Sequence, residues 1–183
     1  MSLSVRARAE HLATFRFVAV HLMETLARWV PGTPEMELKI LFGEHIWDTA
    51  RHADAFGKRT HELRAPLHHT LRPSPEYARI LEELAGAATS AERLHGLYDG
   101  FLPGLEARYR RYLEQTDPLL DAPSVRVLED ALRDLARMRR DSQQLRAELG
   151  ALRLADPAWP LRLAQAEGAV AQIVAPATGE ATP

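Results

Sequence analysis

The chain has no cysteine among its 183 residues, which excludes disulfides, zinc–thiolate sites and thiol chemistry. Its first residues, MSLSVRARAEHLATF, lack the apolar stretch of a secretory signal. No apolar run approaches the roughly 20 residues that a helix needs to span a bilayer. We therefore expect a cytoplasmic protein with no membrane partner.

An excess of positive charge is also missing, because the formal net charge is −2. Nucleic-acid-binding proteins carry a basic excess, so we expect no nucleic-acid partner. Lysine occurs only at Lys39 and Lys58. Two arginine clusters are interspersed with acidic residues, and we interpret them as solvated helix faces, with anion binding as the alternative. These clusters are Arg108, Arg110, Arg111, Arg137, Arg139 and Arg140.

No segment shows the alternation of β-branched residues that a strand would need. Apolar residues instead recur in steps of three and four, bounded by capping residues, prolines and glycines. This pattern predicts helices over residues 4–30, 33–64, 75–84, 89–115 and 121–149. Because Gly100, Pro103 and Gly104 fall inside the fourth of these, we expect a kink there.

Four long helices predict an all-α domain over residues 1–150, an antiparallel up-down-up-down four-helix bundle. A short extra helix lies between its second and third long helices. Residues 151–183 read as a linker, a weak amphipathic helix over residues 160–174 and a disordered tail. We expect this segment to be either a loose tail or an element that docks on the bundle or on another subunit.

The second long helix carries polar residues on its apolar face. His45, Asp48 and His52 share the face formed by Leu38, Leu41, Phe42, Phe56 and Leu63. A helix that buries this face buries two imidazoles and a carboxylate, and buried polar groups need partners. Those partners could be each other, a metal ion or groups on a facing helix.

The next long helix offers one such group. His95 and Tyr98 lie on its apolar face, with Asp99 at the edge. The set His45, Asp48, His52 and His95 would suit iron, manganese or zinc. The alternative is structural hydrogen bonding, with Asp48 holding one of the histidines.

Residues 37–54 (ELKILFGEHIWDTARHAD) resemble the second bundle helix of divergent members of the ferritin-like superfamily. Residues 121–128 and 134–138 look like the start of their fourth helix, so the likeness covers about residues 5–149. In the iron-binding members, two helices carry a glutamate and a histidine three residues apart. Here Thr49 precedes His52 at that spacing, and Leu135 and Met138 stand in the other pair. The resemblance therefore implies a ferritin-like bundle whose standard di-iron ligands are largely lost, with an apolar pocket for a small ligand at its centre.

Two hypotheses about function follow. The first is a non-catalytic bundle that self-associates, as a homodimer, or binds a partner. The alternative is an iron- or manganese-dependent oxidoreductase that acts on a small molecule through the four candidate ligands, with Tyr98 in the pocket. Both predict that His45 and His52 point inward and that Asp48 contacts one of them. We also expect Leu135 and Met138 to face the centre. An inward Glu129 or Asp134 opposite His52 would instead favour the di-iron interpretation.

Overall fold

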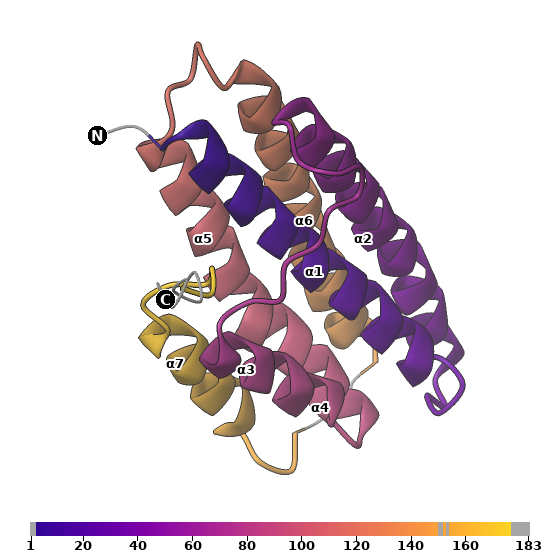
Figure 1. Cartoon of the computed structure of the whole chain (residues 1–183). Helices are drawn as coiled ribbons and strands as arrows, with labels where there is room; N and C mark the ends of the chain where they lie inside the picture. Colours follow the sequence, from indigo (N-terminus) through magenta and orange to yellow (C-terminus); the bar gives the residue numbers. More distant parts are fainter. Residues whose placement is uncertain (1–2, 150–151, 153, 177–183) are drawn as a thin grey trace.

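The computed structural model describes residues 3–149, 152 and 154–176, and this part of the chain folds into helices (Figure 1). In chain order they are α1 (Val5–Trp29), α2 (Met36–Glu62), α3 (Pro75–Ala85), α4 (Ser90–His95), the π-helix η1 (Gly96–Phe101), α5 (Leu102–Gln115), α6 (Ala122–Glu148) and α7 (Trp159–Ala169). An isolated antiparallel bridge joins Pro73 to Val174. The all-α class is confirmed. None of the described helices combines the length and apolarity needed to cross a membrane.

Most helices begin and end near the predicted residues, because the capping side chains take their expected positions. Ser4 caps α1, and Thr89 caps α4 in the predicted capping box with Glu92. The second helix differs from the prediction. The hydroxyl of Thr33 donates a hydrogen bond to the Trp29 carbonyl (2.8 Å) instead of capping α2. It therefore closes the end of α1, and α2 begins three residues later.

The long helices do not follow the predicted up-down-up-down order. α1 and α2 are antiparallel, since the ring of Phe15 contacts Phe56 and that of Trp29 contacts Phe42. α6 is antiparallel to α2 as well. The stretch formed by α4, η1 and α5, however, runs in the same direction as α2. Two hydrogen bonds show this parallel course. Ser90 donates to Glu35 (2.6 Å), and further toward the C-terminal end of both helices Tyr98 donates to His45 (2.5 Å).

The order is therefore up-down-down-up, and residues 63–89 are the reason. They form a crossover from one end of the molecule to the other, visible in Figure 1 in front of α1. The Leu71 N–H donates to the Ala13 carbonyl near one end of α1 (3.2 Å). The Trp29 indole donates to the Ala85 carbonyl near the other end (3.3 Å). The short helix α3, which the sequence predicts, lies within this crossover.

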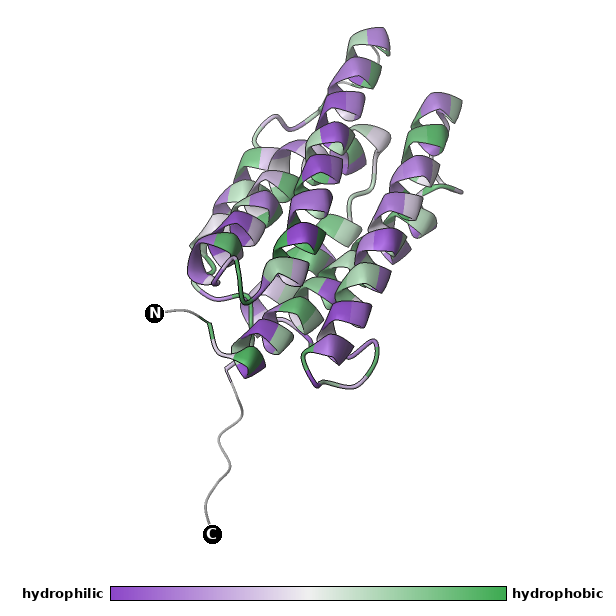
Figure 2. Ribbon diagram, turned by 90° about the horizontal axis from the view of Figure 1, so that it is seen from above, coloured by the Kyte–Doolittle hydropathy of each residue, from purple (hydrophilic) through white to green (hydrophobic). Residues whose placement is uncertain are grey.

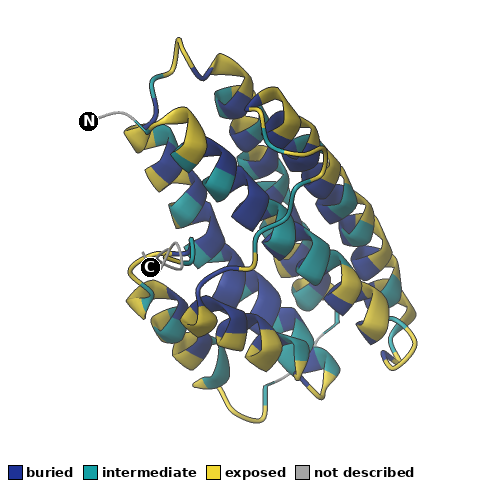
Figure 3. Ribbon diagram, viewed as in Figure 1, coloured by how far each residue is buried: buried dark blue, intermediate teal, exposed yellow. Residues whose placement is uncertain are grey.

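The core lies where α1, α2, α5 and α6 face one another. In Figure 3 the buried residues line the inner faces of these helices, and Figure 2 shows hydrophilic and hydrophobic residues on each. The rings of Phe15, Phe56 and Tyr109 contact one another at its centre. Leu135 and Met138 are 1% and 0% exposed, so the predicted inward face of α6 is confirmed.

A glycine groove receives the C-terminal helix. Gly96, Gly100 and Gly104 follow one another at every fourth residue of η1 and α5, and α7 presents Trp159, Leu163 and Glu167 to them. A methyl group at Gly104 would overlap the Glu167 carboxylate, and one at Gly100 would lie 3.0 Å from the Pro160 carbonyl oxygen. The predicted kink is a π-helix at this groove. The C-terminal helix thus docks on its own chain; the predicted tail from residue 177 lies outside the described residues.

One end of the molecule is tied together by the Asp121 carboxylate, which is 0% exposed. It accepts four hydrogen bonds, from Arg59 of α2 (3.0 Å), Ser124 of α6 (2.6 Å), and Tyr112 (2.7 Å) and Thr116 (2.7 Å) at the end of α5. Arg8 of α1 lies 3.9 Å away. One carboxylate therefore connects four helices.

Candidate functional site

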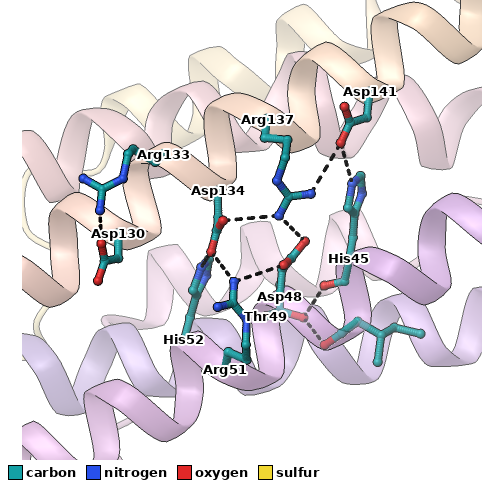
Figure 4. A network of polar contacts seen from close by, with 11 residues as sticks. His45, Asp48, Thr49, Arg51, His52, Asp130, Arg133, Asp134, Arg137 and Asp141 are labelled. Atoms are coloured by element: carbon teal, nitrogen blue, oxygen red, sulfur yellow. Dashed lines mark hydrogen bonds and ion pairs between the residues drawn. The ribbon is translucent and has the colours of Figure 1, made fainter.

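The inward polar residues of α2 meet a matching set on α6. His45, Asp48 and His52 lie at steps of three and four residues along α2. Because the two helices are antiparallel, the same steps on α6 bring a second set opposite them: Asp134, Arg137 and Asp141 (Figure 4). The pairs are His52 with Asp134 (3.0 Å), Asp48 with Arg137 (2.8 Å) and His45 with Asp141 (3.7 Å). We call these six residues the α2–α6 network.

Arg137 is the centre of this network. Its guanidinium donates to Asp48, to Asp134 (3.2 Å) and to Asp141 (3.5 Å). Arg51 of α2 adds hydrogen bonds to Asp134 (2.7 Å) and Asp48 (3.3 Å). The hydrogen bond to Asp48, first among several contacts, raises the pKa of Arg137. The guanidinium therefore remains charged and holds three carboxylates of two helices together.

The contacts of Asp134 and the burial of His45 shift the pKa values of these two groups. The hydrogen bond from His52, with others from Arg137, lowers the pKa of Asp134 to about 2 despite its partial burial. The pKa of His45 lies below that of an exposed histidine. Burial lowers the pKa of His45 to about 4, because it disfavours the charged imidazolium more than Asp48 and Asp141 favour it.

His45 is 0% exposed and is held from the other side by Tyr98 of η1. The two side chains lie 2.5 Å apart, between the phenol oxygen and the imidazole Nδ1. Burial raises the pKa of Tyr98 well above its usual value, so the phenol keeps its proton and its O–H donates a hydrogen bond to Nδ1. The proton of the neutral ring is then on Nε2, which faces Asp141 and has no hydrogen-bond partner among the described residues.

The structure thus brings three of the four candidate ligands to one helix interface and leaves the fourth elsewhere. Both imidazoles of α2 are buried, as predicted, but Asp48 bonds to the two arginines and not to either imidazole. His95 belongs to a separate cluster, in which its Nδ1 contacts Asp99 (2.9 Å) and Arg146 donates to the same carboxylate (2.5 and 3.1 Å).

The α2–α6 network does not fit a metal ion as it is arranged. Arg137 and Arg51 already occupy the carboxylate oxygens of Asp48 and Asp134, and their positive charges oppose a cation. Over residues 3–149, 152 and 154–176, no group of three or more histidine, aspartate and glutamate side chains could hold a metal ion. A site at His45, Asp48, His52 and His95 stays a prediction.

The α6 half of the network is the part that the sequence alone does not assemble. The sequence pattern presents Asp134 only as a possible inward acid, and it places Arg137 on a solvated face. In the structure Asp134 does contact His52, while Leu135 and Met138 still fill the centre. The repeated spacing is the signal that could have identified the network. When two antiparallel helices both carry polar residues at steps of three and four, each residue of one set can lie opposite a residue of the other.

The outer face of α2 carries a second unusual feature. Met36, Ile40 and Trp47 are 62%, 57% and 68% exposed, and they lie along one stripe of the helix. Gly43 lies between them, and a Cβ atom built there would have no neighbour within 4 Å. We call these four residues the α2 outer stripe. Apolar residues that cluster on a surface mark interaction sites more often than scattered ones do.

Comparisons of the chain with protein-family models, with curated proteins and with solved structures find no match. The likeness to the ferritin-like superfamily therefore stays a prediction.

Proposed function

We propose that the protein is a non-catalytic, ferritin-like helical bundle that forms a homodimer through the α2 outer stripe. The observation that carries the dimer is the exposed row of Met36, Ile40 and Trp47 around Gly43. In this proposal the α2–α6 network holds α2 in register so that its outer face is presented in one geometry. Support for the ferritin-like part comes from the single long crossover over residues 63–89, a connection that ferritin-like bundles use.

Gly43 is the strongest argument that a helix packs on this face. A glycine inside a helix costs about 0.5–1 kcal/mol relative to alanine, and no described residue lies close enough to Gly43 to require the small residue. A second helix that approaches closely does require it. Trp47, one turn away, is the residue type that contributes most at the centre of interfaces.

A second copy of α2 is the partner that this face suits. A twofold axis near Gly43 would pair the helices antiparallel and place Trp47 of each copy near Ile40 of the other. Each apolar side chain of the stripe then meets apolar side chains of the second copy, because a twofold axis matches the face with itself.

Light scattering on the full chain tests the dimer at micromolar to near-millimolar concentrations. We expect a dimer for the wild type and a monomer for Trp47→Asp and for Gly43→Leu. The second variant adds a side chain where the isolated chain has open space, so its own fold is preserved. Leu119→Asp is the matched control, because Leu119 is 88% exposed in the loop before α6. A monomeric wild type, or dimers that persist in both stripe variants with unchanged circular dichroism, would refute the proposal.

The metal-dependent oxidoreductase is the second candidate. It is favoured by one observation, the buried Nε2 of His45 beside Asp141 with no hydrogen-bond partner among the described residues. Iron or manganese at this position would require Arg137 to leave the network and the ring proton of His45 to move from Nε2 to Nδ1, with the Tyr98 oxygen then accepting from Nδ1. Metal analysis of untagged protein separates the two candidates, since near-stoichiometric iron or manganese would favour the enzyme.

A further inference from the structure

A cavity of about 390 Å³ opens between α1, α5 and the segment that follows α7. Its volume falls within the range of small-molecule sites. The outer wall is residues 171–174, which are held in place from two sides. The Ser74 N–H donates to the Ile173 carbonyl (2.8 Å), and Arg108 donates to the Val170 carbonyl (3.0 Å). The cavity is therefore preformed by the docking of α7.

The charge of the cavity wall has one sign. Its titratable residues are two arginines, a histidine and Tyr112, and none of its described lining residues is an aspartate or glutamate. Arg108 is compensated by the buried Glu167 carboxylate (2.5 Å), which lies outside the lining. Arg111 is exposed and has no hydrogen bond or ion pair to any described residue. One positive charge at the cavity is thus left without a counter-charge from the described part of the chain.

One other polar group at the cavity can assist an anion at Arg111. His11 uses its Nδ1–H on the Ala7 carbonyl (2.8 Å) and only forms part of the wall. The side-chain amide of Gln115 has no hydrogen bond to the described residues and can donate. Apolar contact is available opposite them from Leu3, Ile173 and Val174.

From this arrangement we infer that the cavity binds a small monocarboxylate with an apolar body. A guanidinium matches a carboxylate through two parallel hydrogen bonds. One uncompensated arginine balances one negative charge, whereas a phosphate group carries about two at neutral pH. The apolar wall contacts the body of the ligand. The arginine cluster at residues 108–111 is then divided, with Arg108 fixing the wall and Arg111 binding the anion.

Calorimetric titration of the full chain with benzoate tests the inference, with benzyl alcohol as the uncharged analogue and inorganic phosphate as the second anion. We expect benzoate to bind the wild type and to bind Arg111→Gln at least about tenfold more weakly, because a charge-assisted hydrogen bond is lost. Arg110→Gln is the matched control, since Arg110 is exposed on the next position of α5 and does not line the cavity. Its affinity should be unchanged.

Three results would overturn the inference. The first is no benzoate binding to the wild type. The second is equal affinity for wild type and Arg111→Gln. The third is binding of phosphate or benzyl alcohol as tight as that of benzoate, which would remove the requirement for a monocarboxylate. None of these results depends on the dimer, because the α2 outer stripe does not line this cavity.

Discussion

Replacing Asp121 by asparagine should destabilise the fold far more than the same change at an exposed aspartate. The substitution keeps the volume but removes the charge that four hydrogen bonds share. It also turns an NH₂ donor toward groups that are themselves donors. The Arg59 guanidinium, with its side chain 10% exposed, would lose its buried counter-charge and keep an ion pair with the exposed Glu62 carboxylate.

The size of the effect follows from that geometry. Removing one partner of a buried ion pair typically costs about 3–5 kcal/mol, because the other charge remains out of water. In a domain of this size each 1 kcal/mol lowers the melting temperature by about 2–4 °C, so Asp121→Asn should melt roughly 6–20 °C below the wild type.

The pH dependence gives a second, independent readout. Burial by itself would raise the pKa of Asp121, but hydrogen bonds from Ser124, Thr116, Tyr112 and Arg59 outweigh it and lower the pKa below 3.8. A carboxyl group whose pKa is lower in the folded state stabilises the fold above its unfolded pKa. That stabilisation is lost as the pH falls through the folded value. The difference in unfolding free energy between wild type and Asp121→Asn should therefore be full at neutral pH and shrink below about pH 3.8.

Urea unfolding followed by circular dichroism measures both quantities. Asp130→Asn is the control, because Asp130 lies on the same helix, is exposed, and pairs only with Arg133 one turn away among the described residues. It should change stability little. If Asp121→Asn unfolds at the same urea concentration as this control, the carboxylate does not hold the four helices together.

Two other positions in the interior give measurable effects. His45→Gln should flatten the decline in wild-type stability between pH 6.5 and about 4, where the unfolded imidazole is protonated but the buried one, whose pKa burial lowers, is not. Equal pH slopes for variant and wild type in urea unfolding would contradict this. Gly104→Ala should displace α7, because the added methyl overlaps Glu167, whereas Gly168→Ala meets nothing within 4 Å and should leave stability unchanged or slightly higher. Hydrogen exchange of the α7 amides distinguishes them, and equal protection in the two variants would refute the glycine groove as the docking requirement.

The helices could be predicted from sequence because the signals that begin and end them are local. Ser4, Ser74 and Thr89 each accept a hydrogen bond from a backbone N–H within the next three residues. Burial of His45 and His52 could be predicted as well, since a shared face follows from helix periodicity alone. Such inferences need only the residues of one helix.

The direction of the third long helix required information of a different kind. Residues 63–89 contain a loop and a short helix whether they turn back or cross over, so their composition does not decide between the two. The contacts that decide are non-local, such as the bond from Leu71 to Ala13. The partners in the α2–α6 network were missed for the same reason. A helical wheel places His52 on a face but does not say which residue of another helix lies opposite.

The arginines show where the interpretation of charge patterns went wrong. Arg110, Arg111 and Arg140 are exposed, as a solvated face predicts, but Arg108, Arg137 and Arg139 pair with carboxylates of other helices. A guanidinium can donate to several oxygens at once while its aliphatic stem packs on apolar groups. An arginine at the edge of a helix face can therefore contact solvent and also bond to carboxylates of a neighbouring helix. Arg137 contacts its three carboxylates from two nitrogens, whereas a lysine would have to reach them from one. The scarcity of lysine therefore fits a fold in which helix register depends on arginine–carboxylate bridges. The arginines that such bridges leave over, Arg111 among them, are the ones free to bind a ligand.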